Sequence, residues 1–257
     1  MNKFHAMALA CLLFPALSYA QRSIVVIGSS TAAGDGATVY DSSWIGRLTK
    51  HYMDLGLIDV VYNRATPGLS TKDCLPTDPS HLGEGQYPYP DTGRDVTKAI
   101  SYRPLPLLVI ISLPSNDVTR GIPMDTFLLN LRTMYNYVTA AGIPCIVTNT
   151  QPRDDIDPAS RTYQQTAGDS ILAEFPHNSM DFWDTLVDPA TLGIKTAFQF
   201  GDGIHLNNAG HNALYTKALQ YGNILSAPLI PLPLTLVSFE GRTEQRSAVL
   251  KIGRAHV

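Results

Sequence analysis

The stretch IVVIGSSTAAGDG, residues 24–36, joins an apolar run of four β-branched residues to a cluster of small residues with two adjacent serines. Such a run ending in glycine and serine is typical of a buried strand that leads into a tight turn. A turn of this kind can cradle a phosphate, begin a helix or carry a nucleophile. The phosphate interpretation fails because Gly28, Gly34 and Gly36 lack the G-x-G-x-x-G spacing and no Walker lysine follows.

The length and composition of the chain fit one full-sized globular core. The sequence has 257 residues, of which 44% are hydrophobic, and its formal net charge is −3. A chain with so little net charge has no basic surface with which to attract nucleic acid. Nucleic acid is therefore excluded as an expected partner, and oligomeric state is left open.

The first 20 residues have the pattern of a secretory signal peptide. Lys3 precedes an apolar run over residues 6–17, and the small residues of Ser18-Tyr19-Ala20 suit signal peptidase. The run is too short for a membrane anchor, which needs about 20 apolar residues, and Pro15 interrupts it. We expect residues 1–20 to be removed, and the mature chain to be secreted or periplasmic with no membrane span.

Cleavage there would remove Cys11 and leave Cys74 and Cys145. Two cysteines are too few for a disulfide framework of the kind that stabilises small secreted domains. A single bridge between them is left open, because the sequence alone does not give the distance between their Cα atoms.

Short apolar runs alternate with helical patterns along the chain. Val- and Ile-rich runs without polar alternation predict strands buried on both faces of a parallel sheet. The expected strands are residues 24–27, 60–62, 107–111, 143–148 and 179–182, and the expected helices are 43–55, 96–101, 124–141, 158–174 and 208–221. This order predicts an α/β three-layer sandwich.

Two segments lie outside this alternation. The connection over residues 74–94 is rich in Pro, Gly and Tyr and is long enough either to contact substrate or to be a surface excursion. After residue 226 a Pro-spaced linker leads to two alternating, strand-like runs. We therefore expect a catalytic or binding domain over residues 21–226, and over 227–257 a linker with the opening of a truncated β-sandwich.

Polar residues follow the first four expected strands. They are Ser29 and Ser30, Asn63, residues 114–117 and residues 151–153. Far downstream, Asp202 and His205 stand three residues apart, just before the last expected helix. Because ligands of open parallel sheets bind at the carboxyl ends of the strands, these side chains can converge on one site.

Four separated blocks, taken together, resemble the SGNH hydrolase family, the GDSL-type lipases and esterases. GSSTAAG is similar to the first block, with Ser30 at the nucleophile position, and NRATPG to the second, with Gly68. PSND is similar to the third, with Asn116, and DGIHLNNAGH to the fourth, with Asp202 and His205. One block is weak evidence, but four in the expected order over most of the chain form a specific signature.

The resemblance implies a flavodoxin-like fold with a five-stranded parallel sheet, and acyl transfer without metal or cofactor. His205 would take the proton of Ser30, and Asp202 would hold the histidine tautomer. The oxyanion would be bound by the backbone N–H groups of Ser30 and Gly68 and by the amide of Asn116.

Two positions depart from the family pattern. Ser29 replaces the usual aspartate and Pro114 the usual glycine, and neither position is expected to perform chemistry. Counting back from Gly34 selects Ser30 rather than Ser29 as the nucleophile.

Other interpretations of these residues are structural. Ser30 could cap a helix, and Asp202, His205 and His211 could suggest a metal site, although His211 is better explained as a packed helix residue. Asp117 is expected to tether its own loop.

The resemblance implies an ester substrate, either a small molecule or a polysaccharide. Tyr87 and Tyr89 could stack on a sugar or pack within their loop, and Arg153 could contact substrate or be a solvated charge. The polar loop favours a short, acetyl-type ester on a carbohydrate over a lipid. The alternatives are a non-catalytic carbohydrate-binding module on the same fold and a metal-dependent phosphodiesterase.

Overall fold

The computed structural model describes residues 21–77, 90–113, 115–221 and 224–226, together with the backbone of two strands over 236–244 and 247–254. The expected signal peptide, and with it the expected cleavage, lies outside the described residues. No helix within the described ranges is long and apolar enough to cross a membrane.

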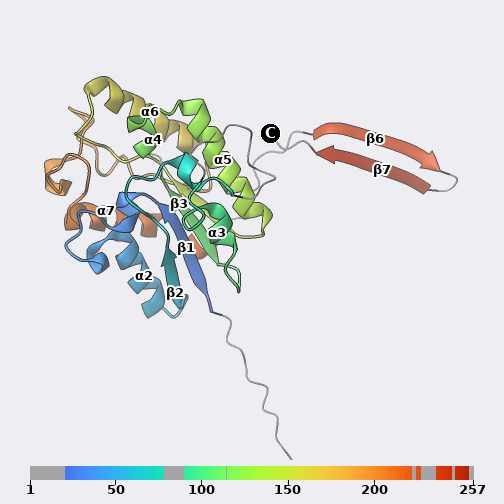
Figure 1. Cartoon of the computed structure of the whole chain (residues 1–257), viewed down its shortest axis with the longest axis horizontal. Coiled ribbons are helices and arrows are strands. Elements are labelled where there is room, and N and C mark those ends of the chain that lie inside the picture. Colours follow the sequence, from blue (N-terminus) through green and yellow to red (C-terminus); the bar gives the residue numbers. More distant parts are fainter. Residues whose placement is uncertain are drawn as a thin grey trace, which may run out of the picture.

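A five-stranded, all-parallel sheet forms the centre of the chain (Figure 1). Its strands are β1 (Ser23–Gly28), β2 (Val60–Asn63), β3 (Leu108–Ser112), β4 (Cys145–Thr148) and β5 (Ser179–Met180). Their order in the sheet is β2-β1-β3-β4-β5, and each neighbouring pair is parallel. This is the flavodoxin-like order, so the predicted fold class is confirmed.

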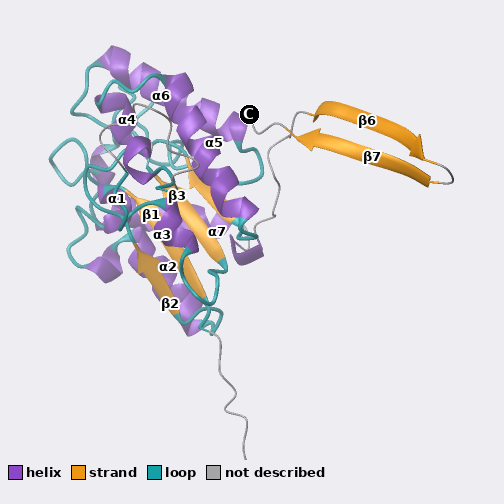
Figure 2. Cartoon of the chain, turned by 45° about the vertical axis from the view of Figure 1, so that its right-hand side comes forward, coloured by secondary structure: helices purple, strands orange, loops and turns teal. Residues whose placement is uncertain are grey.

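Helices cover both faces of the sheet (Figure 2). One face carries α2 (Trp44–Asp54) and α7 (Asn208–Gln220), and the other carries α3 (Val96–Ile100), α5 (Met124–Ala140) and α6 (Pro158–Glu174). Short helical elements lie in the loops: α1 (Ser30–Ala33), η1 (Tyr40–Ser42), η2 (Thr71–Cys74), α4 (Ser115–Thr119), η4 (Thr196–Phe198) and η5 (Ile224–Ser226).

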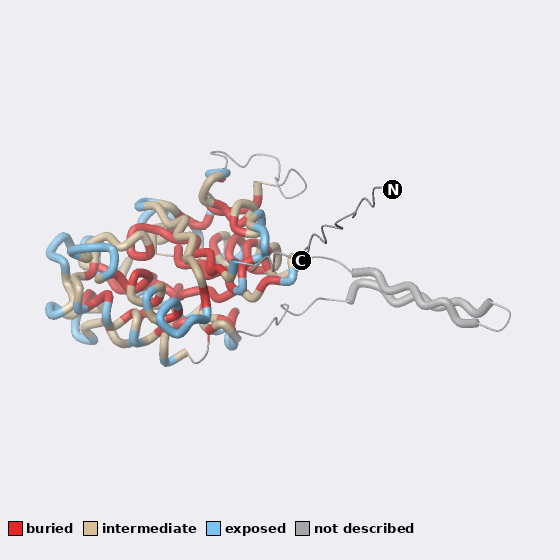
Figure 3. Tube along the Cα trace, turned by 90° about the horizontal axis from the view of Figure 1, so that it is seen from below, coloured by how far each residue is buried: buried red, intermediate tan, exposed pale blue. Residues whose placement is uncertain are grey.

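Side chains alternate between the two faces along each strand. Val25 and Ile27 pack with α3, α5 and α6, whereas Ile24 and Val26 pack with α2 and α7. All four are fully buried, and Figure 3 shows the buried segments in the interior of the body. Both faces being covered explains why the strand sequences are continuously apolar.

Two of the predicted strands are longer than the strands that form in the structure. The fourth begins at Cys145 rather than at residue 143, because Pro144 has no N–H to give to the ladder. The fifth ends at Met180, because the N–H of Phe182 donates to the side chain of Asn149 (2.6 Å) instead of a neighbouring strand.

The two strand-like runs near the end of the sequence form an antiparallel pair, β6 (Leu236–Glu244) and β7 (Ser247–Arg254). They make a separate two-stranded sheet. That these strands open a larger β-sandwich stays a prediction.

Cys74 and Cys145 are free thiols, and both are buried. The bridge that the sequence left open is therefore not formed. Burial raises the pKa of each thiol, which keeps the sulfur protonated and unreactive.

Candidate active site

Ser30 lies at the turn between β1 and α1, at the carboxyl end of a central strand. Ser29 has an extended backbone and donates its N–H to the carbonyl of Ser112 on β3 (3.1 Å), and Ser30 is the first helical residue. Ser29 thus occupies the cap position, without a side-chain capping bond. The interpretation of Ser30 as a helix cap is therefore wrong.

The helix that carries Ser30 is tied to the neighbouring strand. Asn63, at the end of β2, donates its side-chain amide to the carbonyl of Ala32 (2.8 Å) and accepts from the N–H of Ala65 (3.0 Å). Both bonds of Asn63 are to the backbone, and the second lies at the start of the segment that carries Gly68. Its bond to α1 fixes the orientation of the serine turn against the sheet.

Asp202 and His205 form a hydrogen-bonded pair in the loop that precedes α7. Asp202 Oδ2 lies 2.6 Å from His205 Nδ1, and Asp202 Oδ1 accepts the backbone N–H groups of Ile204 (2.9 Å) and His205 (2.8 Å). The carboxylate therefore holds both the loop backbone and the imidazole ring. His205 Nε2 is left on the opposite side of the ring.

The pKa of the Asp202 carboxyl is about 2. Partial burial acts to raise it, but the hydrogen bonds from the His205 and Ile204 backbone and from the His205 ring outweigh that effect. Asp202 therefore remains a carboxylate near neutral pH and accepts a hydrogen bond from the protonated Nδ1 of His205.

The serine turn and the histidine loop meet at Asp35 and Gly36. The Asp35 N–H bonds to the Ser30 carbonyl (3.0 Å), and its carboxylate lies 3.9 Å from His205 Nε2. Gly36 has φ +88°, and a Cβ there would collide with the Leu206 carbonyl oxygen. The imidazole Nε2 thus faces the segment that begins with Ser30.

No hydrogen bond joins the side chains of Ser30 and His205, both of which are described in full. In unliganded enzymes the bond between nucleophile and base is often long and tightens only with substrate.

The two further expected oxyanion donors, Gly68 and Asn116, lie on adjacent loops. Gly68 has φ +85°, a left-handed conformation that suits glycine. Asn116 Nδ2 donates to the carbonyl of Leu69, the next residue after Gly68 (2.9 Å), so one of its two amide protons is committed and one remains.

Asp117 joins these two loops instead of tethering its own. It is fully buried and accepts from the Thr71 N–H (3.1 Å) and the Thr71 hydroxyl (2.5 Å). The expectation from the sequence is thus wrong, because the partner lies on η2. Burial raises the pKa of the Asp117 carboxyl to about 6, although the bonds from Thr71 act against the rise.

Arg153 is not a solvated charge, since only 5% of it is exposed. Its guanidinium binds Asp155 and the side-chain oxygen of Asn116. Tyr87 and Tyr89 lie outside the described residues. The two ends of their loop are held together by bonds from Asp91 to Asp73 (2.8 Å) and from Thr77 to Asp95 (2.6 Å).

Two supporting residues have contacts that were not predicted from the sequence, which marked Gln151 only as a polar residue after a strand. Arg120 donates to the carbonyl of Gly68 (2.6 Å) and to Asp73 (2.8 Å), and Gln151 donates to the carbonyl of Ile204 (3.1 Å). Two features of the sequence pointed to these residues. Arg120 lies one helical turn after Asn116, and Gln151 follows the end of a strand.

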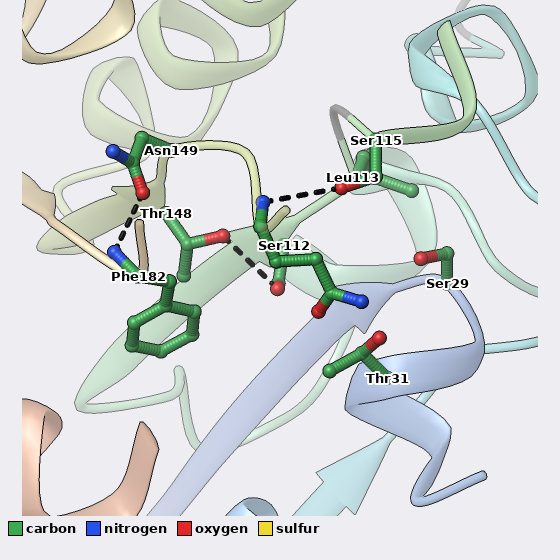
Figure 4. Close-up of a pocket in the computed structure, with 9 residues that line it drawn as sticks. Ser29, Thr31, Ser112, Leu113, Ser115, Thr148, Asn149 and Phe182 are labelled. Carbon is green, nitrogen blue, oxygen red and sulfur yellow. Dashed lines mark hydrogen bonds between the residues drawn. The ribbon is translucent and has the colours of Figure 1, made fainter. Parts of the chain in front are cut away.

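A small polar pocket lies beside the serine turn (Figure 4). It has room for about one water molecule. Residues at or shortly after the ends of β1, β3, β4 and β5 line it: Ser29, Thr31, Ser112, Leu113, Ser115, Thr148, Asn149, Gln151 and Phe182. A hydrogen bond from Thr148 to Ser112 (3.0 Å) crosses its wall.

His211 is a buried structural residue on α7, as expected. Its Nδ1 accepts from the Trp44 N–H (3.4 Å) and its Nε2 donates to the Asp35 carbonyl (3.0 Å). Burial lowers the pKa of His211, in keeping with a neutral ring. In the described part of the chain no three His, Cys, Asp or Glu residues are grouped so as to hold a metal ion.

The model of the GDSL-like lipase/acylhydrolase family matches residues 26–213. A comparison with curated proteins finds no match.

Solved structures share the fold at low identity. TesA is 19% identical with a TM-score of 0.58, over 79% of this chain and 99% of its own. The psychrotrophic esterase EstA from Pseudoalteromonas sp., inhibited by monoethylphosphonate, is 18% identical with a TM-score of 0.55, over 78% and 96%. The lipase/acylhydrolase from Enterococcus faecalis is 20% identical with a TM-score of 0.52, over 78% and 94%.

Proposed function

This chain belongs to the GDSL-like lipase/acylhydrolase family and is a carboxylic ester hydrolase, and we propose that it cleaves short-chain esters through Ser30, His205 and Asp202. We further propose that the ester is an acetyl group on a carbohydrate and that the enzyme acts after export. Family membership favours turnover over the alternative of a non-catalytic binding module.

The observation that carries the proposal is the pair formed by Asp202 and His205. The carboxylate lies 2.6 Å from Nδ1, so the proton of a neutral imidazole belongs on Nδ1 and Nε2 is free to act as a base. The Nε2 atom faces the segment that starts at Ser30, as its 3.9 Å distance from Asp35 indicates.

The proposed reaction proceeds in two acyl transfers. His205 Nε2 takes the proton of the Ser30 hydroxyl as Ser30 Oγ attacks the ester carbonyl. The negative oxygen of the tetrahedral intermediate is bound by the N–H groups of Ser30 and Gly68 and by the free amide proton of Asn116. The histidine then gives its proton to the leaving alcohol, and water releases the acyl group from Ser30 by the same steps in reverse order.

The lining of the pocket beside the nucleophile supports a small, polar substrate. Five hydroxyl side chains and two amides surround a space of about one water molecule. Such a surface disfavours a long alkyl chain, because each hydroxyl would lose hydrogen bonds to water without compensation. A space of this size also has no room for a long alkyl chain, which supports a short acyl group.

Hydrolysis of p-nitrophenyl esters of increasing chain length by the purified mature chain tests the substrate class. We expect kcat/KM to be highest for acetate and to fall for butyrate and longer chains, and we expect release of acetate from an acetylated polysaccharide. A maximum at long chains would overturn the short-chain proposal while leaving the esterase assignment intact.

The same assay with EDTA tests the chemistry. Activity that survives EDTA and the Ser29→Ala substitution, but is lost in Ser30→Ala, agrees with the proposed nucleophile. Loss of activity with EDTA would instead indicate a metal-dependent reaction and contradict the proposed serine mechanism.

Export is tested separately, by expressing the full chain and sequencing the N-terminus of the recovered protein. Our proposal predicts a protein outside the cytoplasm that begins at Gln21. An intact Met1 in the cytoplasmic fraction would contradict it.

A further inference from the structure

We propose that Arg153 is a positioning residue that fixes the side-chain amide of Asn116 in the orientation needed to bind the oxyanion. This inference rests on the proposed function, in which Asn116 is an oxyanion donor. In this role Arg153 affects the rate of the chemical step through Asn116 and does not contact the substrate.

Arg153 is a buried cation with a defined set of partners. Its Nε and Nη2 atoms donate to the two carboxylate oxygens of Asp155 (2.8 and 2.7 Å), and its Nη1 donates to Asn116 Oδ1 (3.2 Å). The side chain of Arg153 is 6% exposed and that of Asp155 is 27% exposed. The bidentate ion pair fixes the plane of the guanidinium, so the direction of the third bond is fixed as well.

The bond to Asn116 determines which way its amide points. A guanidinium has only donors, so it accepts no bond from an NH2 group and must face the amide oxygen. With Oδ1 held by Arg153, Nδ2 points to the opposite side, where it donates to the Leu69 carbonyl (2.9 Å). Rotation of the amide by half a turn would set NH2 against the guanidinium and oxygen against the carbonyl, which is unfavourable at both ends.

The segment that carries Arg153 also holds the histidine loop. Gln151 Nε2 donates to the Ile204 carbonyl (3.1 Å), and the N–H of Asp154 donates to the Gly203 carbonyl (2.7 Å). The residues after β4 therefore contact both the loop between Asp202 and His205 and the side chain of Asn116. This one segment therefore supports both the oxyanion donor and the base, and Arg153 fixes the position of the donor relative to the base.

A double-mutant cycle on the purified mature chain tests this role, with p-nitrophenyl acetate as substrate. We expect Arg153→Met to lower kcat by about 10- to 100-fold with little change in KM. A loss of this size is expected when an oxyanion donor is displaced by a fraction of an ångström. Asn116→Ala should lower kcat by about 100-fold or more. The double variant should be no slower than Asn116→Ala alone, because Arg153 acts through Asn116.

Matched variants separate positioning from folding. Arg153→Lys keeps a donor and a charge and should recover part of kcat. Arg132→Met removes another arginine–carboxylate pair, that with Glu174 (2.7 Å) between α5 and α6, and should leave kcat unchanged. Thermal unfolding of each variant shows whether it is folded, and Arg153→Lys carries the cycle if Arg153→Met is not.

The outcomes distinguish this inference from the proposed function. Additive losses in the double variant, or a rise in KM with kcat unchanged, would overturn the positioning role and favour direct contact with substrate. If Ser30→Ala is as active as the parent, the proposed function itself fails and this inference fails with it. If Ser30→Ala is inactive but the losses of Arg153→Met and Asn116→Ala are additive, the role of Arg153 is overturned and the proposed function stands.

Discussion

The site has a histidine half, the loop with Asp202 and His205, and an oxyanion half, the loops with Gly68 and Asn116. Each half contains one carboxyl group, Asp202 in the first and Asp117 in the second, and their surroundings shift the two pKa values in opposite directions. Asp202 is partly exposed and accepts hydrogen bonds from Ile204 and His205, and its pKa is about 2. Asp117 is fully buried between the loops of Gly68 and Asn116, and its pKa is raised to about 6.

The difference reflects how each half is built. The histidine half is a loop in which a charged carboxylate serves the proposed chemistry directly. The oxyanion half is part of the packed interior, and its carboxylate holds two loops together at the cost of desolvation. Replacing Asp202 should therefore affect mainly the rate, and replacing Asp117 should affect mainly the stability.

The largest expected effect is on rate, from Asp202→Asn. The amide can still accept from the loop backbone, but its NH2 group would face His205 Nδ1 and shift the ring proton to Nε2. We expect kcat to fall by about 10⁴-fold while thermal stability changes little. The measurement is kcat for p-nitrophenyl acetate beside a thermal melt.

Asp184→Asn is the matched control, because Asp184 pairs with Lys217 on the surface (2.7 Å). Its kcat should equal that of the parent. A rate for Asp202→Asn within tenfold of the parent would contradict the role of the histidine half.

The pH dependence of stability should show the effect of Asp117. Its folded pKa of about 6 lies above its ordinary value of 3.8, so the folded state binds more protons between pH 4 and 6. The contribution of Asp117 to the free energy of unfolding is therefore greatest in acid. It falls by about 3 kcal/mol as the pH rises through that window. Urea unfolding at pH 4 and pH 7 measures this fall.

Asp117→Asn removes the titrating group and should lack this fall, whatever its absolute stability. The informative quantity is the difference between the parent and the variant in the pH dependence of the unfolding free energy. If both depend on pH equally, the carboxyl of Asp117 does not titrate in the way its burial implies.

The junction between the serine turn and the histidine loop is tested by Gly36→Ala. The left-handed backbone and the collision with the Leu206 carbonyl should destabilise the fold by about 2 kcal/mol and move the histidine loop, so that kcat falls too. Gly56→Ala has a similar positive φ of +64° but open space around its Cβ, and should keep full kcat. Equal rates for the two variants would indicate that the junction does not position His205.

The smallest expected effect is that of a reducing agent. A disulfide would contribute about 2–4 kcal/mol, but Cys74 and Cys145 are free in the structure. The thermal midpoint should therefore be the same with and without dithiothreitol. A lower midpoint under reduction would show that a bridge exists.

The sequence predicted the sheet because its strands are buried on both faces and carry runs of Val and Ile. It also predicted where Ser30, Asn63 and Asn116 would lie, since residues after parallel strands share one edge of the sheet. The ends of strands were less predictable, as Pro144 and the side chain of Asn149 show.

Contacts between loops could not be predicted, because they depend on strand order and on the reach of long side chains. Arg153 and Asn116 are 37 residues apart, and Asp117 and Thr71 are 46 apart. Neither pair has a spacing that marks it in the sequence. The supports of the site therefore emerged from the structure, while the proposed reacting groups were already visible in the sequence.

The most direct test of the account is to label the nucleophile. The purified chain is treated with a p-nitrophenyl alkylphosphonate, which traps an activated serine, and the labelled peptide is identified by mass spectrometry. The account predicts one phosphonyl group on Ser30 and none in Ser30→Ala. A label on Ser29, or equal labelling of the parent and Ser30→Ala, would contradict it.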